Sequence, residues 1–319
     1  NDDFVNKVAG TCTYGIDVID GSNIDGNGHG THCAGTAAGH KFGVAKEANL
    51  IAVRVLNNLG TGSTSGIIEG INWMVDHAQT TGNASVANLS LGGSYSASLN
   101  SATAAAVLAG ISVMVAAGND NRDACNFSPS STDIAVTVGA TDDNDQRASY
   151  SNYGPCLDLF GPGSAIESAY IGSPSATATL SGTSMATPHI AGIAAVYQSI
   201  YNFTLTPTQV TDLLISQATK DVIYNVNGTR PIGDDNSPNL LGYVHTCNGT
   251  KSNDDSGIFH STKSAFRALS VIFLCFSGFE LGLGTYSLKL PDETNILTIK
   301  TGFLNLLMQC ILLPIVAMV

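Results

Sequence analysis

The chain has 319 residues, of which 44% are hydrophobic and 12% are charged, so it can build a core and is not intrinsically disordered. Thirteen Lys and Arg stand against 25 Asp and Glu, which gives a formal net charge of −12. Because the chain also lacks a cluster of basic residues, these numbers argue against a nucleic-acid-binding surface.

Short apolar runs alternate with helical patterns from residue 1 to about residue 244. The runs are continuous, as in strands that are buried on both faces, and Ile67, Ile71 and Met74 show the helical spacing of the segments between them. Parallel strands need long crossover connections, so this alternation predicts βαβ units and an α/β fold with a mainly parallel sheet. The predicted strands are residues 50–56, 85–91, 111–117 and 134–140, and the predicted helices are residues 63–79, 99–108, 183–201 and 207–218.

The composition changes after Tyr243. A polar, turn-rich stretch predicts a linker over residues 244–264, and residues 265–319 form a hydrophobic tail without an assigned fold. Its apolar parts, residues 265–278 and 303–319, are shorter than the roughly 20 clean apolar residues of a membrane-spanning helix. Three interpretations of this tail stay open: a non-native extension, a membrane element and a packed appendage.

The seven cysteines include no CxxC spacing, and their odd number requires at least one thiol that is free or pairs outside the chain. Asn-x-Ser/Thr triplets begin at Asn126, Asn202, Asn227 and Asn248, which weakly favours a secretory route. The chain opens on polar residues without an initiator Met, so we expect its natural start to lie upstream of Asn1.

A first glycine-rich motif, DGNGHGTHCAG, covers residues 25–35. It brackets His29 between Gly28 and Gly30, which predicts an imidazole that is presented to a cleft rather than an ordinary surface or core histidine. His29, His32 and Cys33 could also suggest a metal, but their spacing does not match a standard zinc site.

Two further motifs are candidates for function: the first ends in a backbone edge, and the second contains a serine at the start of a helix. Residues 83–93 end in Ser-Leu-Gly-Gly, an edge with which an extended peptide can pair as an added strand, although an ordinary turn has the same pattern. In LSGTSMATPHIAG, residues 180–192, Ser184 opens a helix of small residues. A nucleophile there gains from the helix dipole and from exposed amides that can stabilise an oxyanion, whereas the plain alternative is a serine helix cap.

Together, HGTHCAG, SLGG, AAGN and SGTSMATPH resemble signatures of the subtilisin-like serine proteases, the subtilases, and most closely their fungal proteinase K and cerevisin branch. The motifs occur in the family order over about residues 1–243. The resemblance implies a three-layer α/β fold with helices on both faces of the sheet, and a serine endopeptidase that acts through an acyl-enzyme. It also implies polypeptide substrates, a propeptide or protein inhibitor as a further partner, and a secreted or vacuolar location.

The same resemblance implies roles for individual residues. Ser184 matches the nucleophile, His29 the general base, and Asn119 the side-chain donor of the oxyanion hole. The residues matching the two substrate-binding edges are Gly60, Thr61, Gly62, Ser90, Leu91 and Gly92, and those matching the wall of the P1 pocket are Ala116, Ala117 and Gly118.

The triad also needs an acid, which in this family precedes the histidine. Asp20 is only nine residues before His29 and is rejected as the family's acid, and a replacement by Asp20 or Asp17 is the weaker alternative. We expect the acid upstream of residue 1, so that residues 1–243 form a catalytic domain that lacks its first strand. An inert subtilase-like fragment or a peptide-binding pseudoprotease is therefore the alternative function.

The resemblance finally implies structural features outside the chemistry. Cys125 and Cys156 match a disulfide of some relatives, and Cys33 matches a buried thiol beneath the histidine. No cofactor is required for the chemistry. A structural calcium ion would have the Asp158 carboxylate and the carbonyl groups of Asp133 and Ala135 as its ligands.

Overall fold

The computed structural model describes residues 1–5, 10–225, 232 and 236–244, and the backbone of three short strands further on. It divides the chain into two units: Asn1–Val244 together with Leu312–Val319, and His245–Ile311. The last residues of the expected tail 265–319, Leu312–Val319, group with the first unit. Most of that tail and nearly all of the expected linker lie outside the described residues. Within the second unit, β13 (Tyr286–Leu288) and β14 (Leu297–Ile299) form an antiparallel pair.

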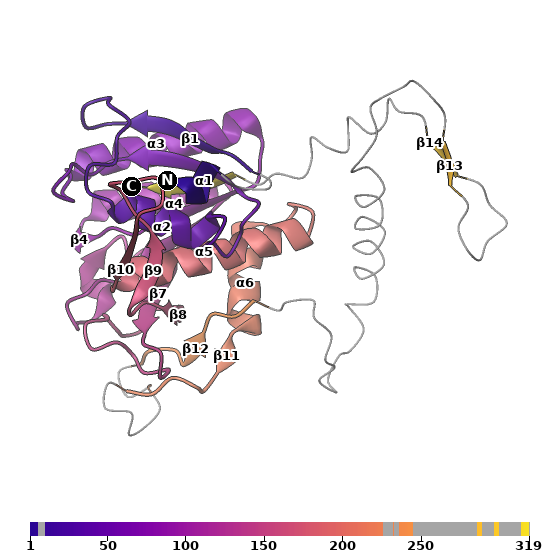
Figure 1. Ribbon diagram of the computed structural model, residues 1–319. Coiled ribbons are helices and arrows are strands. Elements are labelled where there is room, and N and C mark those ends of the chain that lie inside the picture. Colours follow the sequence, from indigo (N-terminus) through magenta and orange to yellow (C-terminus); the bar gives the residue numbers. More distant parts are fainter. Residues whose placement is uncertain are drawn as a thin grey trace. The chain divides into compact units, whose positions relative to one another are not determined.

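A nine-stranded sheet forms the centre of the first unit (Figure 1), in the order β1-β2-β15-β3-β5-β7-β8-β12-β11. Within the described residues the neighbouring strands pair in parallel except β11 and β12, which confirms the expected mainly parallel sheet. The strands are β1 (Cys12–Asp17), β2 (Asn49–Arg54), β3 (Ser85–Leu89), β5 (Ile111–Ala116), β7 (Val136–Thr141), β8 (Leu159–Pro162), β11 (Thr219–Lys220), β12 (Leu240–Leu241) and β15 (Pro314–Met318).

Helices cover both faces of this sheet, as expected. Helices α2 (His29–Ala38), α5 (Thr183–Ile200) and α6 (Pro207–Gln217) bury apolar side chains in one cluster. Helices α3 (Thr64–Thr81) and α4 (Ala97–Leu108) contribute to a second cluster on the opposite face. The expected helices and strands are confirmed, with ends that shift by a few residues.

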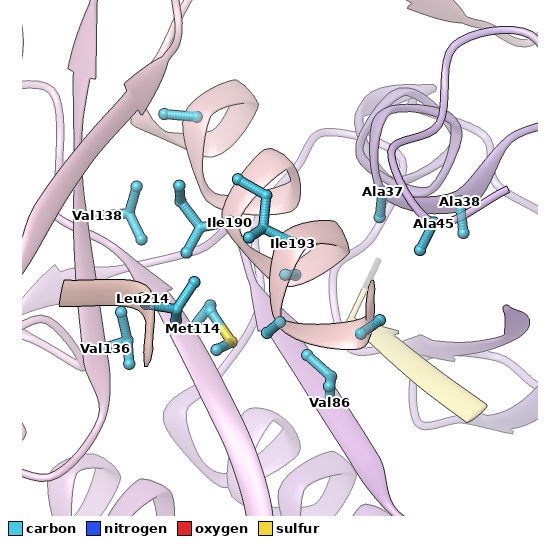
Figure 2. Close-up of a cluster of buried hydrophobic side chains, with 14 of the residues drawn as sticks. Ala37, Ala38, Ala45, Val86, Met114, Val136, Val138, Ile190, Ile193 and Leu214 are labelled. Carbon is cyan, nitrogen blue, oxygen red and sulfur yellow. The ribbon is translucent and has the colours of Figure 1, made fainter. Parts of the chain in front are cut away.

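The first cluster fills the space between α5 and the sheet (Figure 2). Val86 of β3 and Met114 of β5 point toward Ile190 and Ile193 of α5, and all four side chains are buried. Neighbouring residues such as Ala87 point to the other face and join the second cluster. This alternation explains why the strands read as continuous apolar runs: each of them is buried on both faces.

Caps set the ends of several helices. Ser63 accepts a hydrogen bond from the N–H of Gly66 at the start of α3, and Gly82 ends that helix with a φ of 64°. Thr206 and Gln209 form a reciprocal capping box at the start of α6, around Pro207. The remaining elements are α1 (Asp2–Val5), a single 3-10 turn η1 (Ala124–Asn126), and two small antiparallel pairs, β4 (Gly93–Ser94) with β6 (Phe127–Ser128) and β9 (Ile166–Ala169) with β10 (Thr177–Leu180).

Among the helices in the described part of the chain, none combines the length and the apolar character that crossing a bilayer would require.

Candidate active site

The candidate site lies at the carboxyl edge of the parallel sheet, where loops of an α/β fold gather. Strand β3 leads directly into Ser90, and β5 leads into Ala117, Gly118 and Asn119. Helix α5 starts at the same edge, because the N–H of Gly118 donates to the hydroxyl of Thr183 at 3.1 Å. The fold thereby brings together three motifs that are far apart in the sequence.

Ser184 is the second residue of α5, so its N–H is among the four that have no acceptor within the helix. Its hydroxyl donates to the carbonyl of Ser90 at 3.3 Å. Its own carbonyl accepts from the Ser90 hydroxyl at 2.8 Å and from the Cys33 thiol at 3.3 Å. The serine is therefore held between the end of β3 and helix α2, and it remains partly accessible.

His29 is the first residue of α2, and Asp25 holds that helix end in place. The Asp25 carboxylate accepts from the N–H of Gly28 at 2.7 Å and from the N–H and hydroxyl of Thr31 at 2.9 and 2.6 Å. Burial alone would raise the pKa of Asp25, but these hydrogen bonds lower it below its ordinary value. Gly28 has a φ of 95°, and a Cβ there would meet the ring of Tyr170 at 2.4 Å.

The environment of His29 favours a neutral imidazole. Burial lowers its pKa, the nearby His32 lowers it further, and Asp25 opposes them only in part. Among the described residues no carboxylate forms a hydrogen bond with the His29 ring, so the acid of a triad is not found there. Asp17 and Asp20 bind Arg54 instead, at 2.8 and 2.7 Å.

The amide of Asn119 is oriented by the start of α5. Its Oδ1 atom accepts from the N–H of Thr183 at 2.8 Å and from the Thr183 hydroxyl at 3.0 Å. The same hydroxyl accepts the bond from Gly118, so one threonine links the helix end to the loop after β5. With Oδ1 engaged, the Nδ2 donor is the group that Asn119 has left for a substrate oxygen. The sequence analysis did not single out Thr183.

Asn152 is a second residue that the sequence analysis missed. It is fully buried, and its Oδ1 accepts from the N–H groups of Asp120 and Arg122, both at 3.0 Å. Its Nδ2 donates to the carbonyl of Ala117 at 2.8 Å. These three bonds clamp the loop that carries Asn119. The only sequence signal is a polar residue within the motif SNYGP, which does not reveal its partners.

A cleft of about 530 Å³ runs between the two expected substrate edges. Its lining includes His29, the segment Gly60–Gly62 and the segment Ser90–Gly92. The first edge is a turn held by Asn57, whose side chain accepts from the N–H of Thr61 at 3.2 Å. Both edges therefore face one groove, as pairing with an extended peptide would require.

A second cavity, of about 390 Å³, adjoins the groove. Ala116, Ala117 and Gly118 form one wall, and Leu91 and Gly92 belong to its lining. Gly118 has a φ of 103°, and a Cβ there would lie 2.4 Å from the Asn152 amide, so a side chain at this position would disturb the wall.

The side chains of His32 and Cys33 are engaged with backbone carbonyl groups. The Nε2 atom of His32 lies 2.9 Å from the carbonyl of Ile166 and 3.1 Å from that of Ala178. Burial raises the pKa of the Cys33 thiol to about 12, which makes it a weak nucleophile. Within the described residues no group of three or more His, Cys, Asp or Glu side chains is placed so that it could hold a metal ion.

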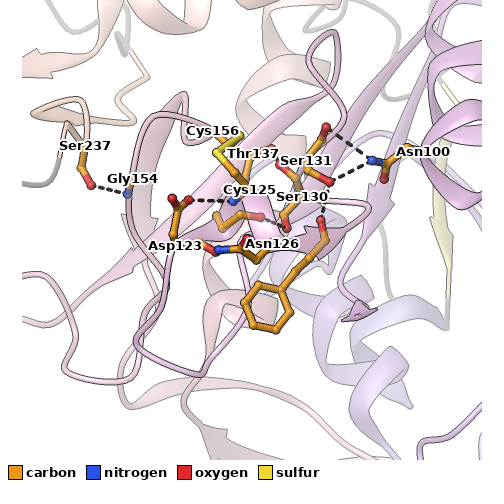
Figure 3. The surroundings of a disulfide bond; sticks show 12 residues. Asn100, Asp123, Cys125, Asn126, Ser130, Ser131, Thr137, Gly154, Cys156 and Ser237 are labelled. Carbon is orange, nitrogen blue, oxygen red and sulfur yellow. Dashed lines mark hydrogen bonds between the residues drawn. A yellow bond between two sulfur atoms is a disulfide. The ribbon is translucent and has the colours of Figure 1, made fainter. Parts of the chain in front are cut away.

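The structure joins Cys125 and Cys156 in a disulfide, with Cα atoms 5.3 Å apart (Figure 3). Asp123 supports the bridge, because its carboxylate accepts from the N–H of Cys125 at 2.9 Å. Close by in sequence, the Asp158 carboxylate accepts from the N–H of Thr137 at 2.7 Å. Burial raises the pKa of Asp158 to about 6 despite this bond.

The fold and the site define an α/β protein in which His29 lines a groove, Asn119 lines the adjoining cavity, and the helix-start residue Ser184 is hydrogen-bonded to Ser90 of the groove lining. The family model described as "Subtilase family" matches residues 7–244. The chain therefore belongs to the subtilase family.

Individual relatives agree with this assignment. The chain is 47% identical over 232 residues to a "Cuticle-degrading serine protease" of Arthrobotrys oligospora, covering 72% of this chain and 54% of the relative. It is 51% identical over 241 residues to an "Extracellular serine proteinase" of a Thermus species, covering 75% of this chain and 56% of the relative. The chain thus spans about half the length of these curated relatives.

A solved structure is similar as well. The crystal structure of a cold adapted subtilisin-like serine proteinase matches with a TM-score of 0.68 and 45% identity. The match covers 76% of this chain and 84% of the other. The three-layer fold expected from the sequence is therefore the fold of a solved relative.

Proposed function

We propose that this protein is a serine endopeptidase that hydrolyses peptide bonds through an acyl-enzyme. The observation that carries the proposal is that Ser184, at the start of α5, is hydrogen-bonded to Ser90, which lines the groove together with His29, while Asn119 lines the adjoining cavity. The serine protease names of the relatives support it.

In the proposed mechanism, a substrate pairs as an extended strand with the segments Gly60–Gly62 and Ser90–Gly92. The Ser184 hydroxyl rotates from the Ser90 carbonyl toward His29, which takes its proton as the oxygen attacks the substrate carbonyl. The lowered pKa of His29 keeps the imidazole neutral and able to accept this proton. The developing oxyanion receives hydrogen bonds from Asn119 Nδ2 and from the Ser184 N–H. His29 then returns the proton to the leaving amine, and water repeats the sequence on the acyl group.

The acid that orients His29 is proposed to come from outside residues 1–244. The described residues support this, since their nearby carboxylates are engaged with Arg54 or with the start of α2. In subtilisin, loss of the acid alone lowers kcat about 3 × 10⁴-fold. The rate of this chain therefore depends strongly on whether that acid is supplied.

The direct experiment is labelling with a serine-directed fluorophosphonate. We expect the label on Ser184 of the full chain, at a rate well above that of a His29→Ala variant, and no label on a Ser184→Ala variant. A full chain that is labelled no faster than His29→Ala would refute the proposed role of His29. Mass spectrometry of the labelled peptide identifies the residue.

The alternative is a peptide-binding pseudoprotease or inert fragment of a subtilase. One observation favours it: no described carboxylate reaches the His29 ring. It predicts that a peptide aldehyde and the matching peptide acid bind equally well, because an aldehyde gains affinity only by adding to an active serine. Isothermal titration of the two ligands separates the alternatives, since an endopeptidase should bind the aldehyde at least tenfold more tightly.

We also propose a structural calcium ion, with the Asp158 carboxylate and the carbonyl groups of Asp133 and Ala135 as ligands. The residues fit such an ion, because Asp158 is a partly buried carboxylate that forms no salt bridge within the described residues, and calcium accepts carboxylate and carbonyl oxygens together. Bound calcium would supply the missing positive charge. It has no step in the proposed chemistry.

The natural substrates are proposed to be extended polypeptides with a large side chain for the cavity beside Gly118. A secretory-pathway location, secreted or vacuolar, is supported by the "Extracellular" relative and by a disulfide in the structure. A propeptide or protein inhibitor that occupies the same groove is the proposed protein partner.

A further inference from the structure

Four Asn-x-Ser/Thr triplets lie within the described residues, and each is a candidate acceptor of an N-linked glycan. They cover residues 83–85, 88–90, 126–128 and 202–204. The glycan is joined to the asparagine amide, and the hydroxyl group two residues later is the second feature that defines an acceptor. The exposure of these two side chains therefore separates the four triplets.

Two of the triplets belong to β3 and its two ends, and neither presents its hydroxyl group to solvent. Asn88 is 0% exposed within β3, and its amide donates to the hydroxyl of Ser90 at 3.0 Å. Asn83 is exposed, but Ser85 is 2% exposed and its hydroxyl donates to the carbonyl of Asn83 at 3.1 Å. Both hydroxyl groups are thus part of the packed interior around the central sheet.

The triplet 126–128 lies beside the substrate groove. Asn126 is exposed, and its amide donates to the carbonyl of Asp123 at 3.3 Å. Ser128 is 0% exposed, and its hydroxyl accepts from the N–H of Ser96 at 2.8 Å. Phe127 and Ser128 also line the cavity of about 390 Å³ that adjoins the groove, so a glycan here would crowd the place of a substrate.

The triplet 202–204 differs from the other three because both of its polar side chains are exposed. It forms the turn that follows α5 and precedes α6. Asn202 and Thr204 are exposed, and no hydrogen bond with another described residue engages the Asn202 amide. The Thr204 hydroxyl donates to the carbonyl of Tyr201 at 2.7 Å, which is also at the surface.

The turn is anchored by the residues that alternate with these polar ones. Phe203 and Leu205 pack against the first hydrophobic cluster. The N–H of Phe203 donates to the carbonyl of Gln198 at 2.7 Å, and the Gln198 amide donates to the carbonyl of Leu205 at 2.9 Å. Asn202 takes the left-handed φ of 54°, which asparagine tolerates better than most residues. A glycan on Asn202 would therefore replace no contact of the core.

The turn is also remote from the groove. Ser184 lies at the start of α5 and Ile200 at its end. With a rise of 1.5 Å per residue, these two residues are about 24 Å apart along the helix axis. A bulky, hydrated group beyond Ile200 would leave the groove open to a substrate.

We propose that Asn202 is an N-glycosylation site, and that Asn83, Asn88 and Asn126 stay unmodified. The donor is an oligosaccharide that is linked to a lipid diphosphate. The Nδ2 atom of Asn202 loses a proton and forms a bond to the anomeric carbon of the sugar, while the bond from that carbon to the diphosphate breaks and the lipid diphosphate leaves. The inference rests on the proposed secretory-pathway location and is independent of the peptidase chemistry.

The test produces the full chain with an added secretion signal in a eukaryotic host, in a Ser184→Ala background that prevents self-cleavage. The added signal brings the chain to the glycosylation machinery whatever its natural location. Treatment with an N-glycosidase in heavy-oxygen water converts each glycosylated asparagine to a labelled aspartate. We expect the label at position 202 and not at positions 83, 88 and 126. An unlabelled position 202, or a label at any of the other three, would overturn the proposal.

This positional readout is needed because the triplets at Asn227 and Asn248 lie outside the described residues, so the total mass of glycan alone does not decide. It also involves no catalysis by the chain. A missing label at position 202 is therefore distinguishable from a failure of fluorophosphonate to label Ser184.

A matched pair of substitutions tests the acceptor itself. Thr204→Ser keeps a hydroxyl group and Thr204→Ala removes it, while both keep Asn202. We expect the serine variant to retain the glycan at position 202 and the alanine variant to lose it, as Asn202→Gln should. Because residue 204 is exposed, both variants should be secreted and should melt within a few degrees of the parent, which excludes misfolding as the cause. Loss of the glycan from both Thr204 variants, or its retention in both, would contradict the proposal.

Discussion

The side-chain oxygen of Asn119 accepts a hydrogen bond from the backbone N–H of Thr183 at 2.8 Å, and the residue after Thr183 is Ser184. The helix that presents the proposed nucleophile therefore also orients the proposed oxyanion donor. Because the Thr183 hydroxyl makes a second bond to the same oxygen, the amide is held by two donors. This coupling fixes the Nδ2 group before a substrate arrives, which is what electrostatic stabilisation of an oxyanion requires.

Thr183→Val should therefore lower turnover. It removes the hydroxyl bonds to Asn119 and Gly118, and one ordinary hydrogen bond corresponds to about a five- to tenfold loss in kcat. Asn119→Ala should cost about 10²–10³-fold, because it removes the donor itself. Steady-state kinetics with a chromogenic peptide measures both.

Thr187→Val is the matched control for Thr183→Val. Thr187 lies on the same helix and its buried hydroxyl donates to the carbonyl of Thr183 at 2.8 Å, so the substitution removes a comparable bond that does not reach Asn119. We expect a lower melting temperature with kcat changed less than twofold. Equal kcat losses for the two valine variants would show that the Thr183 effect is merely structural.

The labelling rate of Ser184 should rise with pH through a midpoint below about 6.5, the ordinary pKa of histidine. The neutral form of His29 is the base, and burial together with His32 lowers its pKa more than Asp25 raises it. The active form consequently persists to lower pH than it would at an exposed histidine. Fluorophosphonate labelling across pH 4–9 gives the profile, with His29→Ala as a control that should lack this step. A midpoint above 6.5 would be inconsistent with the buried, neutral base.

Calcium should raise the melting temperature of the protein, and chelation should lower it. The partly buried Asp158 carboxylate has a raised pKa, of about 6, so its environment disfavours the ionised form unless a cation offsets the charge. Asp158→Asn keeps an acceptor for the N–H of Thr137 but removes the charge. We expect this variant to melt at the same temperature with calcium or with chelator. A wild-type protein whose melting temperature is also the same with calcium and with chelator would rule out the calcium site.

Removing the disulfide should lower the free energy of unfolding by about 3–4 kcal/mol. Cys125 and Cys156 are separated by 31 residues, and opening a loop of that length increases the entropy of the unfolded chain. Urea unfolding of Cys125→Ser/Cys156→Ser in the Ser184→Ala background measures the loss. Reductant should lower the urea midpoint of the parent and leave that of the double variant unchanged. Equal urea midpoints for the parent and the double variant without reductant would contradict a stabilising disulfide.

The alternation of strands and helices was predictable because strands such as Ser85–Leu89 and Ile111–Ala116 are buried along their whole length. Full burial requires a continuous apolar run, and such runs are visible in the sequence alone. The glycine-bracketed motifs likewise marked His29 and Ser184, since open access to a side chain needs small neighbours.

The supporting residues were not predictable in the same way. Thr183 and Asn152 act through partners that are 64 and 32 residues away, and a single sequence does not show which polar residues will meet. The pairing of Pro314–Met318 in the sheet was hidden for another reason: a short apolar run at the end of a hydrophobic tail fits a membrane element or a packed appendage as well as a strand.

The central claim is that Ser184 forms an acyl-enzyme. The most direct measurement is the intact mass of the full chain mixed with an activated ester that deacylates slowly, followed by peptide mapping. The account predicts one acyl group per chain, located on Ser184, and a much slower appearance of that adduct in the His29→Ala variant. Ester hydrolysis without an adduct, or an adduct on any residue other than Ser184, would contradict it.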